Sequence, residues 1–313
     1  MKYFITGGAG FIGSNLVDRL VSLGEEVTIY DNLSLGRKEF ISHHIGKKGF
    51  RFIDADLLDF NKLKESMKDH DVVFHLAANS DIDSGRRYSD IDLKQGTIVT
   101  YNVLEAMRLN NIKKIIFSST STIYGEPTII PTPEDYGPLF PISLYGASKL
   151  ACEGLISAFC HNYDINSFIC RFANIVGRRG THGVMVDFIK KIKMNPKELE
   201  ILGDGQQKKS FLHVDEVIDA MLFLINNCKE ELTVCNLGSG DQINIMEVAR
   251  IVAEAMGTQD IEFKCTGGKR GWRGDVPMMN LKIDKINKLG WKAKYNSEEA
   301  VKRAVNELIN VIK

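Results

Sequence analysis

The sequence lacks any apolar run of about 18 residues, the length that a helical membrane span needs. It has no net charge, because 40 Lys and Arg balance 40 Asp and Glu, so nothing marks a basic surface for nucleic acid. Met1 and Lys2 lead at once into strand-like residues, and no signal peptide is expected. These absences predict a cytoplasmic protein that binds neither membranes nor nucleic acids.

The six cysteines show no CxxC spacing. A zinc site or a redox-active pair is therefore not expected, no metal is predicted, and the cysteines are interpreted as buried, reduced thiols. The chain also has no internal repeat and no low-complexity linker. With 313 residues, 44% of them hydrophobic, it can bury one large α/β core or the cores of two coupled lobes.

What the sequence does contain is a regular alternation of short apolar runs with helical periods. Strands are predicted at 2–6, 26–30, 50–54, 71–76, 113–118 and 167–171, and helices at 11–23, 98–110 and 144–163. Apolar strands alternating with helices are typical of a parallel sheet covered on both faces, with right-handed crossovers. The predicted fold class is therefore α/β, with a doubly wound parallel (Rossmann) sheet.

After about Phe172 the alternation becomes less regular. Short strands are predicted at 199–202, 209–213 and 233–237, and helices at 214–227, 245–256 and 297–312. Ser297 is the predicted cap of the last helix. We expect a smaller C-terminal α/β lobe, with chain segments exchanged between it and the first lobe.

A glycine-rich turn joins the first predicted strand to the first predicted helix. Its glycines read both as Gly8-x-Gly10-x-x-Gly13 and as Gly7-x-x-Gly10-x-x-Gly13. Residues without side chains let the turn tighten and let the backbone approach a pyrophosphate, which the free N–H groups of the helix would bind. In this strand–turn–helix context the motif predicts a dinucleotide site.

The ends of the next strands complete that site. Asp31 ends the second strand, where a carboxylate accepts both adenosine ribose hydroxyls and repels a 2′-phosphate, which favours NAD over NADP. Asp56 and Leu57 follow the third strand, at the position of the adenine edge. The fourth strand ends in small residues at 77–78 that allow close approach of the dinucleotide, and His75 is interpreted as a packed histidine.

Tyr145 and Lys149 stand four residues apart on a predicted helix, hence on one face. A nearby ammonium stabilises phenolate and lowers the pKa of a tyrosine. The pair can then take a proton from a substrate hydroxyl while hydride leaves to nicotinamide. The fifth strand ends in the hydroxyl-rich run 118–122, at the edge of the sheet that faces the ligand.

These segments resemble an extended short-chain dehydrogenase/reductase of the nucleotide-sugar epimerase/dehydratase family, of the UDP-glucose 4-epimerase type. They follow the family's order over nearly the whole chain. The matching segments are TGGAGFIG (6–13), Asp31-Asn32, Asp56-Leu57, HLAA (75–78), FSSTSTIYG (117–125), YGASK (145–149), RFAN (171–174), GDGQQKKSFLHVDE (203–216), NLGSG (236–240) and GDVP (274–277).

The resemblance implies an NAD-dependent enzyme whose catalytic residues are Thr120, Tyr145 and Lys149. Tyr145 would be the acid/base, and Lys149 would lower its pKa and hold the nicotinamide ribose. The implied cofactor-binding residues are Gly7, Gly10, Phe11, Ile12, Gly13, Asp31, Asn32, Asp56, Leu57, Leu76, Ala77, Ala78, Tyr145 and Lys149.

The implied reaction starts with removal of hydride from C4 of a nucleoside-diphosphate sugar, which leaves a 4-keto sugar. Ser121 and Thr122 stand where family dehydratases carry Asp-Glu and where decarboxylases carry Glu, which disfavours both reactions. We favour 4-epimerisation. The alternatives are a net 4-dehydrogenase that releases the 4-keto product, with a GDP-linked hexose or heptose among its candidate substrates, and a non-catalytic NAD-binding regulator.

The resemblance also divides the chain and suggests its partners. It implies an NAD-binding domain over 1–172, to which 211–238 return, and a substrate-binding lobe over 173–210 and 239–313. It implies a homodimer or higher homo-oligomer, built from the helices around 98–110 and 144–163. The implied substrate-binding residues are Ser121, Thr122, Asn174, Val184, Lys209, Arg270, Trp272 and Arg273, of which Lys209 and Trp272 replace the family's usual arginines.

Overall fold

The computed structural model describes residues 1–82, 84–258 and 260–312. The chain forms two compact units. Unit 1 comprises 1–125, 139–171 and 221–235, and unit 2 comprises 126–138, 172–220 and the residues from 236 onward. The units are defined by their compactness and not by the ligands that they bind. The limits of the NAD-binding domain and of the substrate-binding lobe therefore stay a prediction.

Unit 1 is built on a seven-stranded sheet with the order β11-β6-β5-β4-β1-β2-β3. Strand β1 pairs in parallel with β2 on one side and with β4 on the other, so the strand order reverses at β1. This confirms the predicted doubly wound parallel sheet. The strands are β1 (Lys2–Thr6), β2 (Glu26–Asp31), β3 (Phe50–Asp54), β4 (Val72–His75), β5 (Lys114–Thr120), β6 (Asn166–Phe172) and β11 (Leu232–Leu237).

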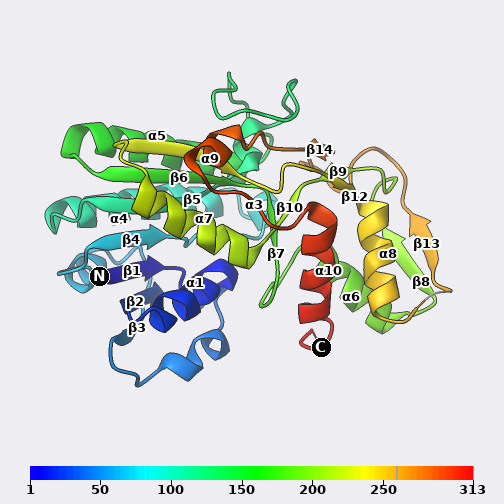
Figure 1. Ribbon diagram of the computed structural model, residues 1–313, viewed down its shortest axis with the longest axis horizontal. Coiled ribbons are helices and arrows are strands. Elements are labelled where there is room, and N and C mark those ends of the chain that lie inside the picture. The colour runs from blue at the N-terminus through cyan, green and yellow to red at the C-terminus, as the bar shows by residue number, and fades with distance from the viewer. Residues whose placement is uncertain (83, 259, 313) are drawn as a thin grey trace. The chain divides into compact units, whose positions relative to one another are not determined.

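Helices cover both faces of this sheet. Helices α2, α4 and α5 share one hydrophobic core with the strands, which includes Phe4, Val103 and Ile156. Helix α1 and the C-terminal end of α7 lie in front of the sheet in Figure 1. The helices are α1 (Phe11–Ser22), α2 (Phe60–Ser66), α3 (Ser84–Arg87), α4 (Val99–Leu109), α5 (Leu144–Tyr163) and α7 (Val214–Asn227), with short turns η1 (Lys38–Phe40), η2 (Ser42–His44), η3 (Leu93–Ile98) and η4 (Ser121–Tyr124).

Unit 2 has small sheets and a core of its own. The sheets pair β10 with β7, β9 with β12 and β14, and β13 with β8, and helices α6, α8 and α10 bury Ile189, Val252 and Val301 against each other. The elements are β7 (Asn174–Val176), α6 (Val184–Met194), β8 (Glu198–Ile201), β9 (Lys208–Lys209), β10 (Phe211–His213), β12 (Ile243–Asn244), α8 (Ile245–Ala255), β13 (Glu262–Cys265), β14 (Met278–Met279), α9 (Asp284–Leu289) and α10 (Ser297–Leu308).

Two details differ from the sequence-based expectation. The cap of α10 is Asn296 and not Ser297: the Asn296 side chain accepts from Glu299 N, and the Glu299 side chain accepts from Asn296 N, a complete capping box. Ser297 is instead buried and donates to Asp241. The cysteines are all free thiols, but Cys228 is only partly buried and Cys265 is exposed. In the described part of the chain, no helix has the length and hydropathy to cross a membrane.

Candidate active site

The glycine turn is held by close backbone contacts. Gly7 has a φ of +70°, and a Cβ there would lie 2.7 Å from the backbone nitrogen of Ala77. A Cβ at Gly13 would collide with the carbonyl oxygen of Gly7. Two strand ends and the first turn of α1 therefore pack so closely that only glycine fits.

Gly10 differs from these packed glycines because the space beside it is open. A Cβ at Gly10 would meet only the Gly7 carbonyl oxygen, at 3.2 Å. Gly10 is also the N-cap of α1, whose first turn has neither a side-chain cap nor an acidic residue. The first N–H groups of α1 are thus available to a ligand that approaches the backbone at Gly10, which fits the pyrophosphate of a dinucleotide.

Asp31 lies at the end of β2, beside this turn. Its carboxylate accepts from Ala9 N and from Leu33 N, each at 2.9 Å, and burial raises its pKa. Asn32 donates to the Asp56 carboxylate at 2.9 Å. Asp31, Asn32 and Asp56 therefore lie together, as binding of the adenosine end would require.

The predicted packed role of His75 agrees with the structure. Its Nδ1 lies 2.7 Å from the Thr6 hydroxyl and its Nε2 lies 2.9 Å from the Thr100 hydroxyl. The Thr100 hydroxyl donates to Gly96 O, so Nε2 of His75 carries the proton and Nδ1 accepts from Thr6. Burial, with the charge of Lys149 as the second cause, lowers the pKa of His75 to about 3, and the ring is neutral.

Thr120 and Tyr145 come together at the carboxyl end of β5. Thr120 caps η4: its hydroxyl oxygen accepts from Thr122 N at 3.1 Å and from the Thr122 hydroxyl at 3.2 Å. Its own proton is thus available for the hydrogen bond that it makes with Tyr145. Tyr145 lies in the first turn of α5, which Ser143 caps by accepting from Gly146 N.

Lys149 lies one turn further along α5 and is 3% exposed. Its Nζ donates to Ser118 O at 2.6 Å and lies 5.9 Å from the centroid of the Tyr145 ring. Burial lowers the pKa of Lys149 to about 8. The three residues that sequence reasoning named as catalytic are therefore neighbours in unit 1.

The pKa of Tyr145 moves in the opposite direction from the one expected. Burial raises it above its ordinary value, and the charge of Asp92 is the next cause, while the hydrogen bond from Thr120 acts to lower it. The ammonium of Lys149 donates to the Ser118 carbonyl and lies 5.9 Å from the centroid of the Tyr145 ring. In the chain by itself, Tyr145 is therefore a protonated phenol at neutral pH.

Asp92 is a residue that sequence reasoning did not single out. It is 3% exposed, one carboxylate oxygen accepts from Asn79 at 2.9 Å, and the other has no hydrogen-bond partner among the described residues. Burial raises the pKa of Asp92, and its charge acts on Tyr145 and on Lys149. The backbone oxygen of Asp92 accepts from Ser148 on α5, at 2.7 Å.

A buried ion pair lies under the hydroxyl-rich turn. Arg171 on β6 contacts Glu153 on α5, with 2.8 Å between Nη2 and Oε2. Ser119 also donates to Glu153, and Arg171 donates to the Tyr124 hydroxyl at 2.9 Å. The pair therefore links β5, η4, α5 and β6, the elements that hold Thr120 and Tyr145.

In unit 2, residues predicted to bind substrate gather around Asp275. Lys209 Nζ donates to the Asp275 carboxylate at 2.6 Å, and Arg270 donates to Asp275 O and to the Glu126 carboxylate. Trp272 is 38% exposed. Arg273 is exposed and makes no ion pair with any described residue, so its charge is the one in this group that no carboxylate neutralises.

The remaining predicted substrate residues lie at the starts of two elements of unit 2. Asn174 begins β7, and its side chain donates to Ser210 O at 3.1 Å. Val184 begins α6 and is partly buried. In unit 1, Ser121 and Thr122 form the first half of η4.

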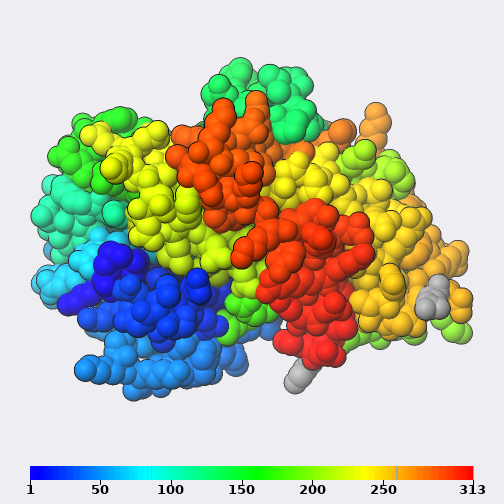
Figure 2. Space-filling model, viewed as in Figure 1, coloured from blue at the N-terminus to red at the C-terminus, as the bar shows by residue number. Residues whose placement is uncertain are grey.

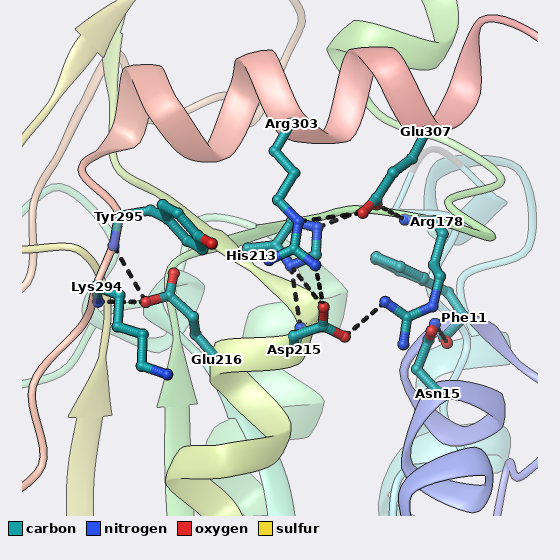
Figure 3. Close-up of polar contacts among 10 residues, drawn as sticks. All are labelled: Phe11, Asn15, Arg178, His213, Asp215, Glu216, Lys294, Tyr295, Arg303 and Glu307. Carbon is teal, nitrogen blue, oxygen red and sulfur yellow. Dashed lines mark hydrogen bonds and ion pairs between the residues drawn. The ribbon is translucent and has the colours of Figure 1, made fainter.

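A charged network fixes the loop between β7 and α6. Figure 3 shows Arg178, His213, Asp215, Arg303 and Glu307 pointing toward one another. Arg178 Nη1 donates to Asp215 at 2.6 Å and Arg178 N donates to Glu307 at 2.7 Å, while the buried His213 contacts Glu307 at 3.1 Å. Both the side chain and the backbone N–H of Arg178 are therefore bound to carboxylates.

Comparison with known proteins gives consistent matches over the length of the chain. The model of the NAD dependent epimerase/dehydratase family matches residues 3–244. A Methanocaldococcus jannaschii protein, provisionally named UDP-glucose 4-epimerase, is 34% identical over 98% of both chains. The crystal structure of a UDP-glucose 4-epimerase from Thermotoga maritima with UDP-glucose superposes with a TM-score of 0.90, at 31% identity and over 100% of both chains. That of a UDP-galactose 4-epimerase superposes with a TM-score of 0.89, at 37% identity and over 99% of both chains.

Proposed function

Because this chain belongs to the NAD dependent epimerase/dehydratase family, we propose that it is a nucleotide-sugar 4-epimerase that works through a 4-keto intermediate. NAD is the cofactor of the family, and the residues around Gly10 and Asp31 fit it. Similar proteins are named for UDP-glucose and UDP-galactose, so a UDP-linked hexose is the first candidate substrate.

The observation that carries the proposal is the hydrogen bond between the hydroxyls of Thr120 and Tyr145 at the carboxyl end of β5. Ligands of doubly wound sheets bind at that edge. Tyr145 would first lose its phenol proton to solvent. A C4 hydroxyl that joins this pair would then give its proton to the Tyr145 phenolate while Thr120 binds the same oxygen. When bound, NAD takes up the C4 hydride and later returns it.

Proton movement in this scheme depends on the charge of Lys149. With a pKa lowered to about 8 by burial, Lys149 is still mainly protonated at neutral pH, as a group that stabilises a developing phenolate must be. The proton on Tyr145 after the first step is the one that returns when the 4-keto sugar accepts hydride on its other face. Atoms and electrons therefore balance without an external reductant.

The residues after Thr120 support epimerisation over two related reactions. Ser121 and Thr122 occupy the positions at which the family resemblance requires carboxylates for dehydration or decarboxylation. The Thr122 hydroxyl donates to Thr120, so it supports the catalytic hydroxyl. Relatives named as decarboxylases are also similar to this chain, and the resemblance implies that Thr122 distinguishes it from them.

Binding of the diphosphate is assigned to unit 2, with Arg273 as its first contact. Lys209 and Arg270 are each paired with a carboxylate, so a substrate must compete for them, whereas Arg273 is exposed and unpaired among the described residues. Trp272, 38% exposed beside it, offers an apolar face to a base or a sugar.

We also propose the homodimer that the resemblance implies. Large apolar side chains are exposed on η3, α4 and α5, as pairing of these elements between two subunits would require. These are Leu93, Ile98, Tyr101, Leu109 and Tyr163, which are 40–53% exposed. Light scattering that gives the mass of one chain at micromolar concentration would exclude the dimer. The cytoplasmic location stays a prediction.

The test presents the purified enzyme with UDP-, GDP- and CDP-linked hexoses and follows NADH absorbance together with product stereochemistry. Epimerisation gives the C4 epimer without accumulated NADH. A net 4-dehydrogenase gives NADH in proportion to a 4-keto product and needs an added acceptor to turn over. Bound NAD that never responds to any nucleotide sugar would favour the non-catalytic regulator.

A further inference from the structure

Three potential metal ligands meet at one point on unit 1, away from the residues proposed for catalysis. Asp18 lies in α1, and His43 and His44 lie in η2, some 25 residues later. Nε2 of His43 lies 2.9 Å and Nε2 of His44 lies 2.7 Å from the same oxygen, Oδ1 of Asp18. All three donor atoms lie within 4.8 Å of one another.

The two histidines are held in this arrangement by their surroundings. Neighbouring residues of a 3₁₀ turn point about 120° apart, yet both rings reach the same carboxylate, with their centroids 3.9 Å apart. His44 is 5% exposed and packs against Phe50, with 5.4 Å between the ring centroids. The side chain of His43 is 46% exposed, so the point where the three ligands meet is open to solvent on one side.

We propose that Asp18, His43 and His44 form a binding site for a divalent transition-metal ion, zinc before others, with water as the fourth ligand. Two imidazole nitrogens and one carboxylate oxygen suit zinc, whereas magnesium and calcium prefer oxygen ligands only. A tetrahedral site with ligands about 2.0 Å from the metal places ligand atoms roughly 3.3 Å apart. The observed 2.7 Å and 2.9 Å need to open by only about half an ångström.

Binding of a metal ion to a neutral ring of this cluster requires a change of tautomer. In the hydrogen-bonded cluster each neutral ring carries its proton on Nε2, which donates to Asp18. A metal ion takes the lone pair of Nε2, so the proton moves to Nδ1 of the same ring. Among the described residues, Nδ1 of His44 has no hydrogen-bond partner. Because no neighbouring group among them donates to Nδ1, this nitrogen is free to take up the proton that leaves Nε2.

A bound ion would fasten the segment between β2 and β3 to α1. In Figures 1 and 2 this segment, which contains η1 and η2, lies beside α1 along the lower edge of the sheet. The same segment begins next to Asp31, and Arg37 N donates to Ala9 O in the glycine turn, at 2.9 Å. Metal binding should therefore slow hydrogen exchange in residues 38–45.

The test uses tag-free enzyme that has been freed of metal with a chelator. Zinc is titrated in competition with a chromophoric chelator, and cobalt is used as a second probe because its visible spectrum reports four-coordinate geometry. The expected result is one ion per chain, with no response to magnesium. Asp18→Asn and His43→Ala should each weaken zinc binding at least tenfold, since each removes one of three ligands.

His161→Ala is the matched control, because His161 is an exposed histidine on α5; it should bind zinc like the wild type. Circular dichroism checks that each variant is folded. A wild type that binds zinc no more tightly than His43→Ala overturns the proposal and leaves a hydrogen-bonded cluster. None of these measurements needs activity, so they are independent of the proposed function.

Discussion

Lys149→Met should stabilise the protein while it abolishes activity. Lys149 is almost fully buried, and its only hydrogen bond among the described residues runs from Nζ to Ser118 O. Methionine has nearly the same length and no charge. The variant therefore removes the cost of keeping an ammonium out of water, together with the charge that the proposed chemistry requires.

The size of the effect follows from the pKa. Burial lowers the pKa of Lys149 from 10.5 to about 8, a difference of about 2.5 pH units, and each unit corresponds to about 1.36 kcal/mol. The charged form therefore costs about 3 kcal/mol at pH 7. Loss of the hydrogen bond to Ser118 O destabilises the variant by about 1 kcal/mol, which offsets part of this gain. The free energy of unfolding should rise by about 2 kcal/mol, and Tm by about 4 °C.

The assay is urea denaturation of the NAD-free enzyme at pH 7 and at pH 10.5. The pKa of Lys149 is lower in the folded than in the unfolded state, so the unfolded wild type binds more protons between about pH 8 and 10.5. The free energy of unfolding of the wild type therefore increases as pH rises through this range. The advantage of the variant should therefore shrink as pH rises. Lys190→Met, at an exposed lysine of α6, should change little. A Lys149→Met enzyme that is less stable than wild type at pH 7 would refute the reasoning.

Three further outcomes are expected. Asp31→Ala should weaken NAD binding about ten- to a hundredfold, since bonds to a charged group are lost, and should relax discrimination against NADP in fluorescence titrations; a wild type that prefers NADP would contradict this. Asp92→Asn removes a charge that raises the pKa of Tyr145, so the rise of kcat/KM with pH should move to lower pH, and an unmoved profile would count against it. Asn296→Ala should cost about 1 kcal/mol in urea denaturation, and a cost near zero would argue against the capping box.

Local signals predicted the parts of the fold that depend on neighbouring residues. The limits of β1 and of α5 coincide with those expected from the apolar patterns at 2–6 and 144–163. Helix α6 was not predicted, although its apolar residues at 185, 186, 189 and 192 have helical spacing. The helix predicted at 98–110 is preceded by η3, a π-helical turn, in which Gly96 leaves room for Ser148.

For the candidate site, too, sequence reasoning found the residues in short motifs and missed those brought together only by folding. The glycine turn and the Tyr145–Lys149 spacing are short motifs, and sequence reasoning found them. Asp92 acts on that pair from a distant part of the chain, and its importance depends on burial, which spacing does not show. The cluster of Asp18 with His43 and His44 likewise forms only when the segment after β2 folds back onto α1. Cysteine spacing, the signal used for metals, could not have revealed it.

The central claim is that hydride leaves C4 and returns to C4 in one active site, with Tyr145 carrying the proton. The most direct measurement uses a UDP-hexose with deuterium at C4 and analyses the product by mass spectrometry and NMR, with Tyr145→Phe in parallel. The account predicts a C4 epimer that retains deuterium at C4, and a folded, NAD-binding variant whose rate is lower by about 10²–10⁴-fold. A product that has lost its deuterium to released NADH, or a Tyr145→Phe enzyme of near-normal rate, would contradict it.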